Sequence, residues 1–308
     1  MKKFIIFILI SNFAFSAEYN WYKAPVKKKP VFKFVHITDT HCISNAEKKK
    51  EPKFIIQIGP YRPHWKDSFH SFLILEKTVE YIKERIKPAF LVHTGDITED
   101  GNYYDLKRAK EILEKLGIPF YVIKGDHDGL KNRNFEKVFG RRCYSVDYGR
   151  WHFLFVSVSP SERELKWIKD RIEKNPRKPT VLFTHRLIFC DILTSFIVKE
   201  FYDKNAIIVM EKAEFFKNLF KKFKNIKMVI SGDIHTNLYY KKDEIHCIST
   251  SSLVEIPHQF RVFEFYRDEI KIKLLTACRL KDVKEKNWKV QKIKIIEINL
   301  KGGGKNEI

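Results

Sequence analysis

The stretch LVHTGDITEDG, residues 91–101, decides the fold predicted for this chain. It opens with Leu91 and Val92, the end of a short apolar run that is typical of a buried strand. Gly95 allows a sharp turn and a close backbone approach, and Asp96 follows it directly. An Asp at the carboxyl end of a strand faces the crevice where open α/β sheets bind ligands. Most Gly-Asp pairs are ordinary turns, so this motif needs support from others.

Four other strand-like runs end in the same way, with Asp or His one to three residues after the last apolar residue. The five strand-end motifs, in chain order, are Asp39-Thr40-His41, Gly95-Asp96, Gly125-Asp126-His127-Asp128, Thr184-His185 and Gly232-Asp233-Ile234-His235. Extended backbone points residues i and i+2 the same way, so Asp39 and His41 are expected to converge. Carboxylates and imidazoles from several strands are the ligands that a two-metal hydrolytic site needs.

Strand-like and helix-like segments alternate along most of the chain, which predicts a largely parallel central sheet. The expected helices are 67–86, 102–116, 162–172 and 213–223, and the expected strands up to residue 230 are 31–37, 90–92, 120–123, 142–148, 151–156, 180–183 and 228–230. Four short alternating runs, 238–241, 245–248, 260–266 and 270–276, and a last run, 291–300, predict strands only. In the first helix, Phe69, Phe72 and Leu73 fall at the spacing of a buried face.

Taken together and in this order, the five motifs resemble the calcineurin-like metallophosphoesterase family. The pattern of that family is D-x-H, G-D, G-N-H-[D/E], a lone His and G-H-x-H, and the resemblance covers residues 31–272. The run GDITEDG…LGIPFYVIKGDHD is most similar to the branch of cyclic-nucleotide phosphodiesterases and purple-acid-phosphatase-like enzymes. The resemblance implies an α/β fold, a four-layer α/β/β/α metallophosphoesterase sandwich with mixed sheets. It also implies an enzyme whose substrate is a small phosphate monoester or diester, hydrolysed by attack of a metal-bound hydroxide.

The resemblance carries residue roles with it. It implies that the first metal ion is held by Asp39, His41 and His235, that Asp96 bridges both ions, and that the second ion is held by Asp126, His185 and Asp233. His127 matches the residue that protonates the leaving oxygen or binds phosphate, and Asp128 matches its orienting carboxylate.

Two positions depart from the family pattern: Asp126 stands where the family has Asn, and Asp233 where it has the first His of G-H-x-H. The extra carboxylates favour oxygen-loving Mn or Fe over Zn, which remains possible. An Asp126 that stays protonated among crowded carboxylates would imitate Asn instead. The departures also leave open an alternative function, a non-catalytic metal- or phosphate-binding protein on a degenerate phosphoesterase fold.

Two arginines near the motifs are candidates for binding the substrate phosphate. Arg186 follows His185 and Arg133 follows the Gly125–Asp128 motif, although either arginine is equally an ordinary surface residue. His93 is expected to support a metal ligand from behind. Structural roles are expected for the remaining histidines, which are His36, His64, His70, His152, His246 and His258. Core packing is expected for Trp151, and a substrate rim for Tyr61 and Trp65.

Residues 1–16 have the features of a signal peptide: Lys2 and Lys3, an apolar run, and small residues before Ala17. The run is too short to span a membrane, so the protein is expected to be secreted or periplasmic, with an uncleaved anchor as the alternative. The predicted divisions are the signal peptide 1–16, a lead-in segment 17–30, the phosphoesterase domain 31–280 and a C-terminal loop, strand and tail 281–308.

The 308-residue chain is 44% hydrophobic and 31% charged, which indicates a globular protein, and its formal net charge is +21. That charge admits weak association with an anionic membrane, but a Lys-rich surface is the simpler interpretation. There is no RNA-recognition signature, so a structural nucleic-acid partner is not expected. The five cysteines lack C-x-x-C spacing, which argues against a cysteine zinc site and leaves disulfides and free thiols both open. The sequence leaves the oligomeric state unknown.

Overall fold

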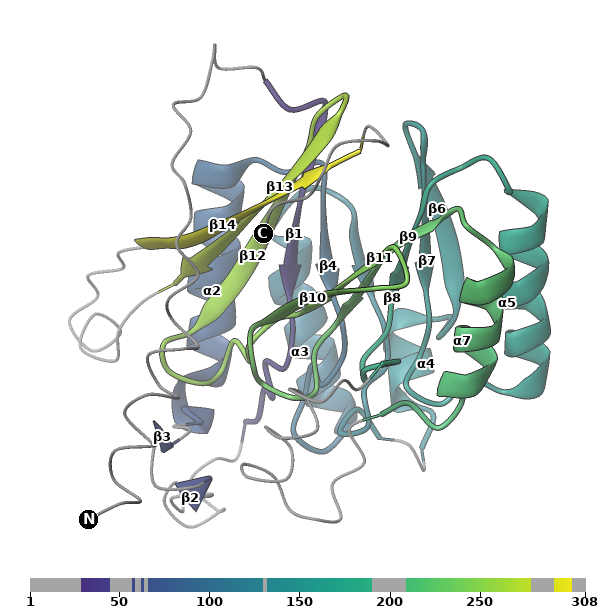
Figure 1. Ribbon diagram of the computed structural model, residues 1–308. Helices are drawn as coiled ribbons and strands as arrows, with labels where there is room; N and C mark the ends of the chain where they lie inside the picture. Colours follow the sequence, from purple (N-terminus) through teal and green to yellow (C-terminus); the bar gives the residue numbers. More distant parts are fainter. Residues whose placement is uncertain are drawn as a thin grey trace, which may run out of the picture.

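Two mixed six-stranded sheets lie face to face, with helices on their outer faces, as the sequence predicted (Figure 1). The computed structural model describes residues 29–44, 57–58, 62–63, 66–129, 132–189, 209–277 and 291–300. In order across the first sheet, the strands are β14 (Gln291–Asn299), β13 (Glu269–Thr276), β12 (Gln259–Phe265), β1 (Phe32–Ile37), β4 (Phe90–His93) and β5 (Phe120–Val122). Strands β1, β4 and β5 are mutually parallel, so their carboxyl ends share one edge.

The second sheet also has a parallel centre and antiparallel edges. In order across it, the strands are β10 (Leu238–Lys242), β11 (Ile245–Ser249), β9 (Ile226–Ser231), β8 (Thr180–Phe183), β7 (Trp151–Phe155) and β6 (Tyr144–Tyr148). Strands β7, β8, β9 and β11 run parallel, while β6 and β10 pair antiparallel at the two edges. Here too, the carboxyl ends of the parallel strands share one edge.

The space between the sheets is filled largely by aromatic rings. Phe34 of β1 is fully buried, and its ring stacks on those of Phe90 and Phe263 at centroid distances of 5.1 and 4.6 Å. Phe153 and Phe183 meet it edge-on from the facing sheet at 5.9 and 5.8 Å. Such aromatic contacts fix the two sheets relative to each other, and hence the loops at their edges.

Helices cover both outer faces. The first sheet is packed against α2 (Ser71–Tyr81), α3 (Tyr103–Glu114) and α4 (Asn134–Phe139), and the second against α5 (Glu162–Lys174) and α7 (Ala213–Lys222). Two starts are capped as their sequences suggest: Asn102 accepts a hydrogen bond from Tyr104 N, and Ser161 forms a capping box with Glu164. These helices confirm the predicted segments to within a few residues, except for α4, which was not predicted.

The first helix departs from its predicted packing, because it begins with a 3₁₀ turn, Ser68–His70, before α2. That turn rotates Phe69 out of the buried face, and its side chain is 62% exposed; Leu73 is 37% exposed, whereas Phe72 is buried. Trp151 lies in the core, as expected. Two short strands that were not predicted, β2 (Gln57–Ile58) and β3 (Arg62–Pro63), pair with each other.

Several sequence expectations fall outside the described residues. These are the signal peptide 1–16, most of the lead-in 17–30, the rim residues Tyr61 and Trp65, and His64, Cys190 and Cys278. Among the residues that are described, no helix has the length and apolar character needed to cross a bilayer. Cys42 and Cys143 are buried free thiols, and Cys247 is also buried. The last strand, β14, is the edge strand of the first sheet rather than a separate unit.

Candidate metal centre

All seven residues expected to bind metal lie just beyond the carboxyl ends of five strands. The first sheet contributes Asp39 and His41 after β1, Asp96 after β4 and Asp126 after β5, and the second contributes His185 after β8 and Asp233 and His235 after β9. Among these side chains, three sets of three are close enough to hold a cation together, and a fourth set joins His41 with Glu99 and His127. The two facing sheets thus bring to one place residues that are up to 196 positions apart in the chain.

The first group consists of Asp39, His41 and His235. His235 Nε2 lies 3.3 Å from Asp39 Oδ1 and 3.3 Å from His41 Nε2. Asp39 and His41 are fully buried, or nearly so. Two imidazole nitrogens and a carboxylate oxygen that converge in this way form one half of a divalent-metal site.

The second group consists of Asp126, His185 and Asp233. His185 Nε2 lies 3.0 Å from Asp126 Oδ1 and 3.5 Å from Asp233 Oδ1. Asp96 lies between the two groups, because its Oδ2 is 3.3 Å from His185 Nε2 and 3.7 Å from His41 Nε2. This is the location that a bridging carboxylate requires.

Several buried polar atoms of the centre are consistent with a bound cation. Asp39 Oδ1, Asp126 Oδ1 and His185 Nε2 form no hydrogen bond within the described part of the chain. Buried polar atoms are rarely left without a partner, so these atoms are available to bind a cation. Because the donors are carboxylate oxygens and imidazole nitrogens, the residues present fit two divalent ions of the Mn, Fe or Zn type.

Unusual backbone conformations aim these side chains inward. Asp39, His41, Asp96, Asp233 and His235 all have positive φ, between 40° and 63°. Asp and His are among the few residues other than glycine that adopt this left-handed region with any frequency. The loops after β4 and β5 also approach each other closely at Gly125. A Cβ built on Gly125 would lie 2.3 Å from Asp96 N.

A partner behind each imidazole fixes its orientation. His41 Nδ1 lies 2.9 Å from Glu99 Oε2, His185 Nδ1 lies 2.8 Å from the Thr94 carbonyl oxygen, and His235 Nδ1 contacts Glu255. With these groups beside Nδ1, each Nε2 is directed toward the centre, the arrangement found behind metal-binding histidines. The sequence reasoning missed Glu99 and Glu255. Glu99 lies within the 91–101 stretch, whereas Glu255 lies in a loop without any periodic signal.

His93, expected to support the site, lies directly beneath it. Its Nε2 is 2.9 Å from Thr40 Oγ1, and its Nδ1 accepts a hydrogen bond from Gly95 N. It therefore connects the loops after β1 and β4. Ordinary structural hydrogen bonds are made by the other described histidines outside the centre, which are His36, His70, His152, His246 and His258.

Burial and neighbouring charges shift the pKa values of several side chains in the centre. Burial opposes the charged form of His185 and of His235, but Asp96 acting on the first and Glu255 on the second raise both pKa values well above the ordinary value. Burial, with Lys66 nearby, lowers the pKa of His41 to about 4. Burial raises the pKa of Asp233 to about 7. Metal binding must therefore displace protons from His185 and His235.

His127 lies at the open side of the centre, with an exposed side chain. Its backbone N–H donates to Asp96 Oδ1 at 2.9 Å, and its Nδ1 lies 2.8 Å from the Glu99 carbonyl oxygen. A carbonyl only accepts, so Nδ1 carries the proton in this contact and Nε2 is left for other partners. Asp128 accepts hydrogen bonds from Thr98 N and Gly125 N. Asp128 thus clamps the loops after β4 and β5, while the Glu99 carbonyl oxygen contacts the His127 ring.

The two candidate substrate arginines lie in different places. Arg186 contacts both departures from the family pattern: its Nη2 is 3.0 Å from Asp126 Oδ2, and its Nε is 3.7 Å from Asp233 Oδ1. Its guanidinium therefore offsets the additional carboxylate charge. Arg133 instead lines a separate cavity beside α4 and α5, so the structure does not bring it to the metal centre.

A profile described as calcineurin-like phosphoesterase matches residues 32–237, about two thirds of the chain. The chain belongs to this family. The matched range contains all seven clustered residues as well as His127 and Asp128. The fold and the relatives confirm the resemblance read from the five motifs.

Three similar proteins show how far the likeness extends. The chain is 32% identical to a probable glycerophosphodiester phosphodiesterase of Arcobacter nitrofigilis over 32% of this chain and 42% of that protein. It is 22% identical to a 3′,5′-cyclic-nucleotide phosphodiesterase of Nostoc over 59% of this chain and 68% of that protein. A dimetal phosphatase from Danio rerio has the same fold, with a TM-score of 0.65 and 13% identity over 89% of this chain and all of that one. The chain thus aligns with less than half the length of the first relative.

Proposed function

We propose that this protein is a dinuclear-metal-dependent phosphoesterase whose substrates are small phosphate esters, diesters in particular. The observation that carries the proposal is the convergence of Asp39, His41, Asp96, His185 and His235 on one buried centre. The preference for diesters rests on the phosphodiesterases among the relatives. Two bound divalent ions would polarise the phosphoryl oxygens and make water a stronger nucleophile near neutral pH.

The residues around the centre divide the remaining tasks. Asp39, His41 and His235 would hold one ion, and Asp126, His185 and Asp233 the other, with Asp96 shared. His127 is suited to donate a proton to the leaving oxygen. Burial opposes its charged form, yet Asp96 and the Glu99 carbonyl oxygen raise its pKa above the ordinary value.

Metal analysis joined to a substrate panel tests the proposal. About two ions per chain and hydrolysis of an aryl phosphodiester are expected, and Asp96→Asn is expected to lose metal and nearly all turnover. Substituting His246, whose ring contacts Tyr239 far along the second sheet, provides a control that should leave both properties unchanged. A fully loaded protein that hydrolyses neither mono- nor diesters at any pH would contradict the proposal.

A second candidate is a non-catalytic metal- or phosphate-binding protein on the same fold. The contacts between Arg186 and Asp126 and Asp233 favour it, because a guanidinium at the second group competes with a cation there. This candidate predicts one tightly bound ion rather than two, and no turnover. Calorimetric titration of metal into metal-free protein distinguishes one site from two.

The export predicted from residues 1–16 and the preference for Mn or Fe are part of the same proposal. N-terminal sequencing of the protein from fractionated cells should find Ala17 first, in the periplasm or the medium. Elemental analysis after purification without added metal should find Mn or Fe above Zn. Cell-associated protein that begins at Met1 would contradict export, and a zinc-only protein would contradict the argument from carboxylate number.

A further inference from the structure

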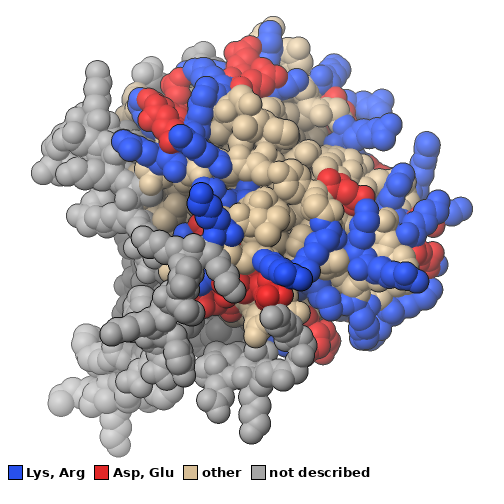
Figure 2. Space-filling view, turned by 90° about the horizontal axis from the view of Figure 1, so that it is seen from above, with Lys and Arg blue, Asp and Glu red and all other residues tan. Residues whose placement is uncertain are grey.

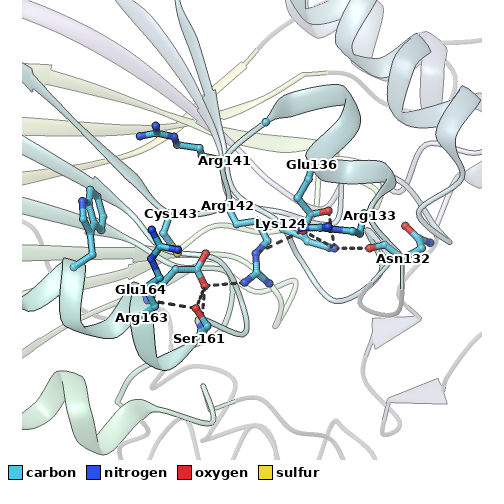
Figure 3. A pocket seen from close by; sticks show the side chains of 12 residues that line it. Lys124, Asn132, Arg133, Glu136, Arg141, Arg142, Cys143, Ser161, Arg163 and Glu164 are labelled. Carbon is cyan, nitrogen blue, oxygen red and sulfur yellow. Dashed lines mark hydrogen bonds and ion pairs between the residues drawn. The ribbon is translucent and has the colours of Figure 1, made fainter.

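A second concave site lies beside the metal centre, in a cavity of about 750 Å³ (Figure 3). Its walls are formed by Lys124, Asn132 and Arg133 before α4, by the turn before β6 and by the first turns of α5. None of the seven clustered residues is part of its lining. The cavity therefore needs an explanation of its own.

Part of the lining is a rigid frame of ion pairs. Arg142 Nη2 lies 2.7 Å from Glu164 Oε2, and its Nε lies 3.5 Å from Glu136 Oε1. Lys124 is only 2% exposed, and its Nζ lies 3.3 Å from Glu136 Oε1 and 3.1 Å from the Asn132 carbonyl oxygen. Both carboxylates of the cavity are thus already neutralised from within it (Figure 3).

Three further arginines in the lining have no such partner. Arg133, Arg141 and Arg163 line the cavity with exposed side chains and form no ion pair within the described part of the chain. The cavity thus holds five cations and two carboxylates. An excess of guanidinium groups in a recess, where field lines are focused, attracts an anion with more than one charge. Planar guanidinium forks match phosphate oxygens in particular.

We propose that this cavity binds a small phosphate-bearing anion with several negative charges, at a site distinct from the metal centre. The rigid frame of ion pairs around the buried Lys124 favours a compact ligand over an extended membrane surface. The floor residue Lys124 directly precedes Gly125 and Asp126.

General attraction to a basic protein must be separated from this site. Figure 2 shows lysine and arginine side chains over much of the described surface on one face, so net charge alone draws anions. A second, smaller hollow offers a control of matched charge. It is lined by Arg177, Lys224 and Lys227, and by Lys222, which already pairs with Glu173. Replacing the first three cations changes the net charge by the same amount as replacing Arg133, Arg141 and Arg163.

The test titrates tripolyphosphate into metal-free protein by calorimetry, because the carboxylate-rich centre repels anions when no metal is bound. One molecule per chain is expected to bind. The triple variant R133S/R141S/R163S should bind at least roughly tenfold more weakly, while R177S/K224S/K227S should stay within about threefold of the unaltered protein. Should the first triple variant fail to fold, judged by circular dichroism, Arg141→Ser and Arg163→Ser alone should each weaken binding by about threefold.

Parallel arms with inorganic phosphate and ADP identify which phosphate source the cavity accepts. Equal weakening by the two triple variants, or binding that never saturates at one molecule per chain, would overturn the proposal. A further arm uses phosphatidylglycerol vesicles. Vesicle binding that tripolyphosphate does not displace, in a protein that binds no tripolyphosphate, would also overturn it and assign the positive charge to a membrane surface instead.

Discussion

Arg186 lies against two carboxylates at positions where the family pattern has an amide and an imidazole. Its positive charge lies close to both Asp126 and Asp233 and offsets their negative charges. Replacing it with Gln should lower the melting temperature of the metal-free protein and enlarge the rise produced by added Mn²⁺, since a cation would then replace the missing charge. Differential scanning calorimetry with and without metal measures both. An unchanged rise would show that Arg186 does not act on the second group.

The reverse experiment restores the family pattern. Asp126→Asn with Asp233→His removes two carboxylates and adds an imidazole next to His185. This double variant should shift the preference from Mn or Fe toward Zn, because softer nitrogen ligands replace oxygen. Competition between metals, followed by elemental analysis, gives the result. An unchanged metal profile would argue that carboxylate number does not set the preference.

His127 provides the sharpest test of catalysis at a single residue. Its ring is exposed and is not needed for either metal group, so His127→Ala should retain both ions. Turnover should fall by roughly 10²–10⁴-fold, the usual contribution of a general acid. The measurement is kcat alongside metal content, with His246→Ala as control. Full activity in His127→Ala would remove the assigned role.

At this scale, the sequence predicted the clustered residues because their spacing follows strand ends. It did not predict Glu255, which lies in a non-periodic loop and reaches His235 only through the fold. It also placed Arg133 near the substrate, although the chain after Asp128 turns toward α4 and carries that side chain to another cavity. Positions that depend on how a loop turns are set by tertiary packing rather than by local pattern.

Among the structural elements, the loops that carry the metal-centre residues matter most, and glycines determine how closely these loops approach one another. Gly125→Ala would place a Cβ 2.3 Å from Asp96 N, so the loops after β4 and β5 must separate. Both metal content and melting temperature should fall. Gly149 in the turn between β6 and β7 has positive φ but no atom within 4 Å of its would-be Cβ, so Gly149→Ala should cost only about 1 kcal/mol and retain metal. Metal content equal in the two variants would contradict this.

Most elements were predictable because apolar periodicity marks them clearly. The helix predicted over 162–172 appears in the structure as α5, with Leu165, Ile168 and Ile172 buried. The 3₁₀ turn before α2 was not predicted, because a 3₁₀ turn and an α-helix have similar apolar spacing in the sequence but differ in rotation per residue. The short helix α4 has too few turns to give a periodic signal.

The coupling of metal binding to pH belongs to the molecule as a whole. The raised pKa values of His185 and His235 stabilise the metal-free protein below about pH 6.5, and this contribution is lost as pH rises through the folded-state values. Metal binding needs both imidazoles neutral, so affinity rises over the same range. The metal-induced increase in melting temperature should therefore grow from about pH 5.5 to about pH 8. A constant or shrinking increase, measured by calorimetry, would contradict this linkage.

Five residues of the metal centre have a left-handed backbone, which lowers the stability of the fold although their side chains are needed to bind metal. These residues are Asp39, His41, Asp96, Asp233 and His235. Each of these conformations is one that glycine or asparagine adopts with less strain. Selection of random variants for heat resistance alone would therefore drift toward those two residues and discard the ligands one by one. Selection for variants that still bind manganese would instead retain the same five residues. The strain at these five residues is offset by the stability that the aromatic core between the sheets provides.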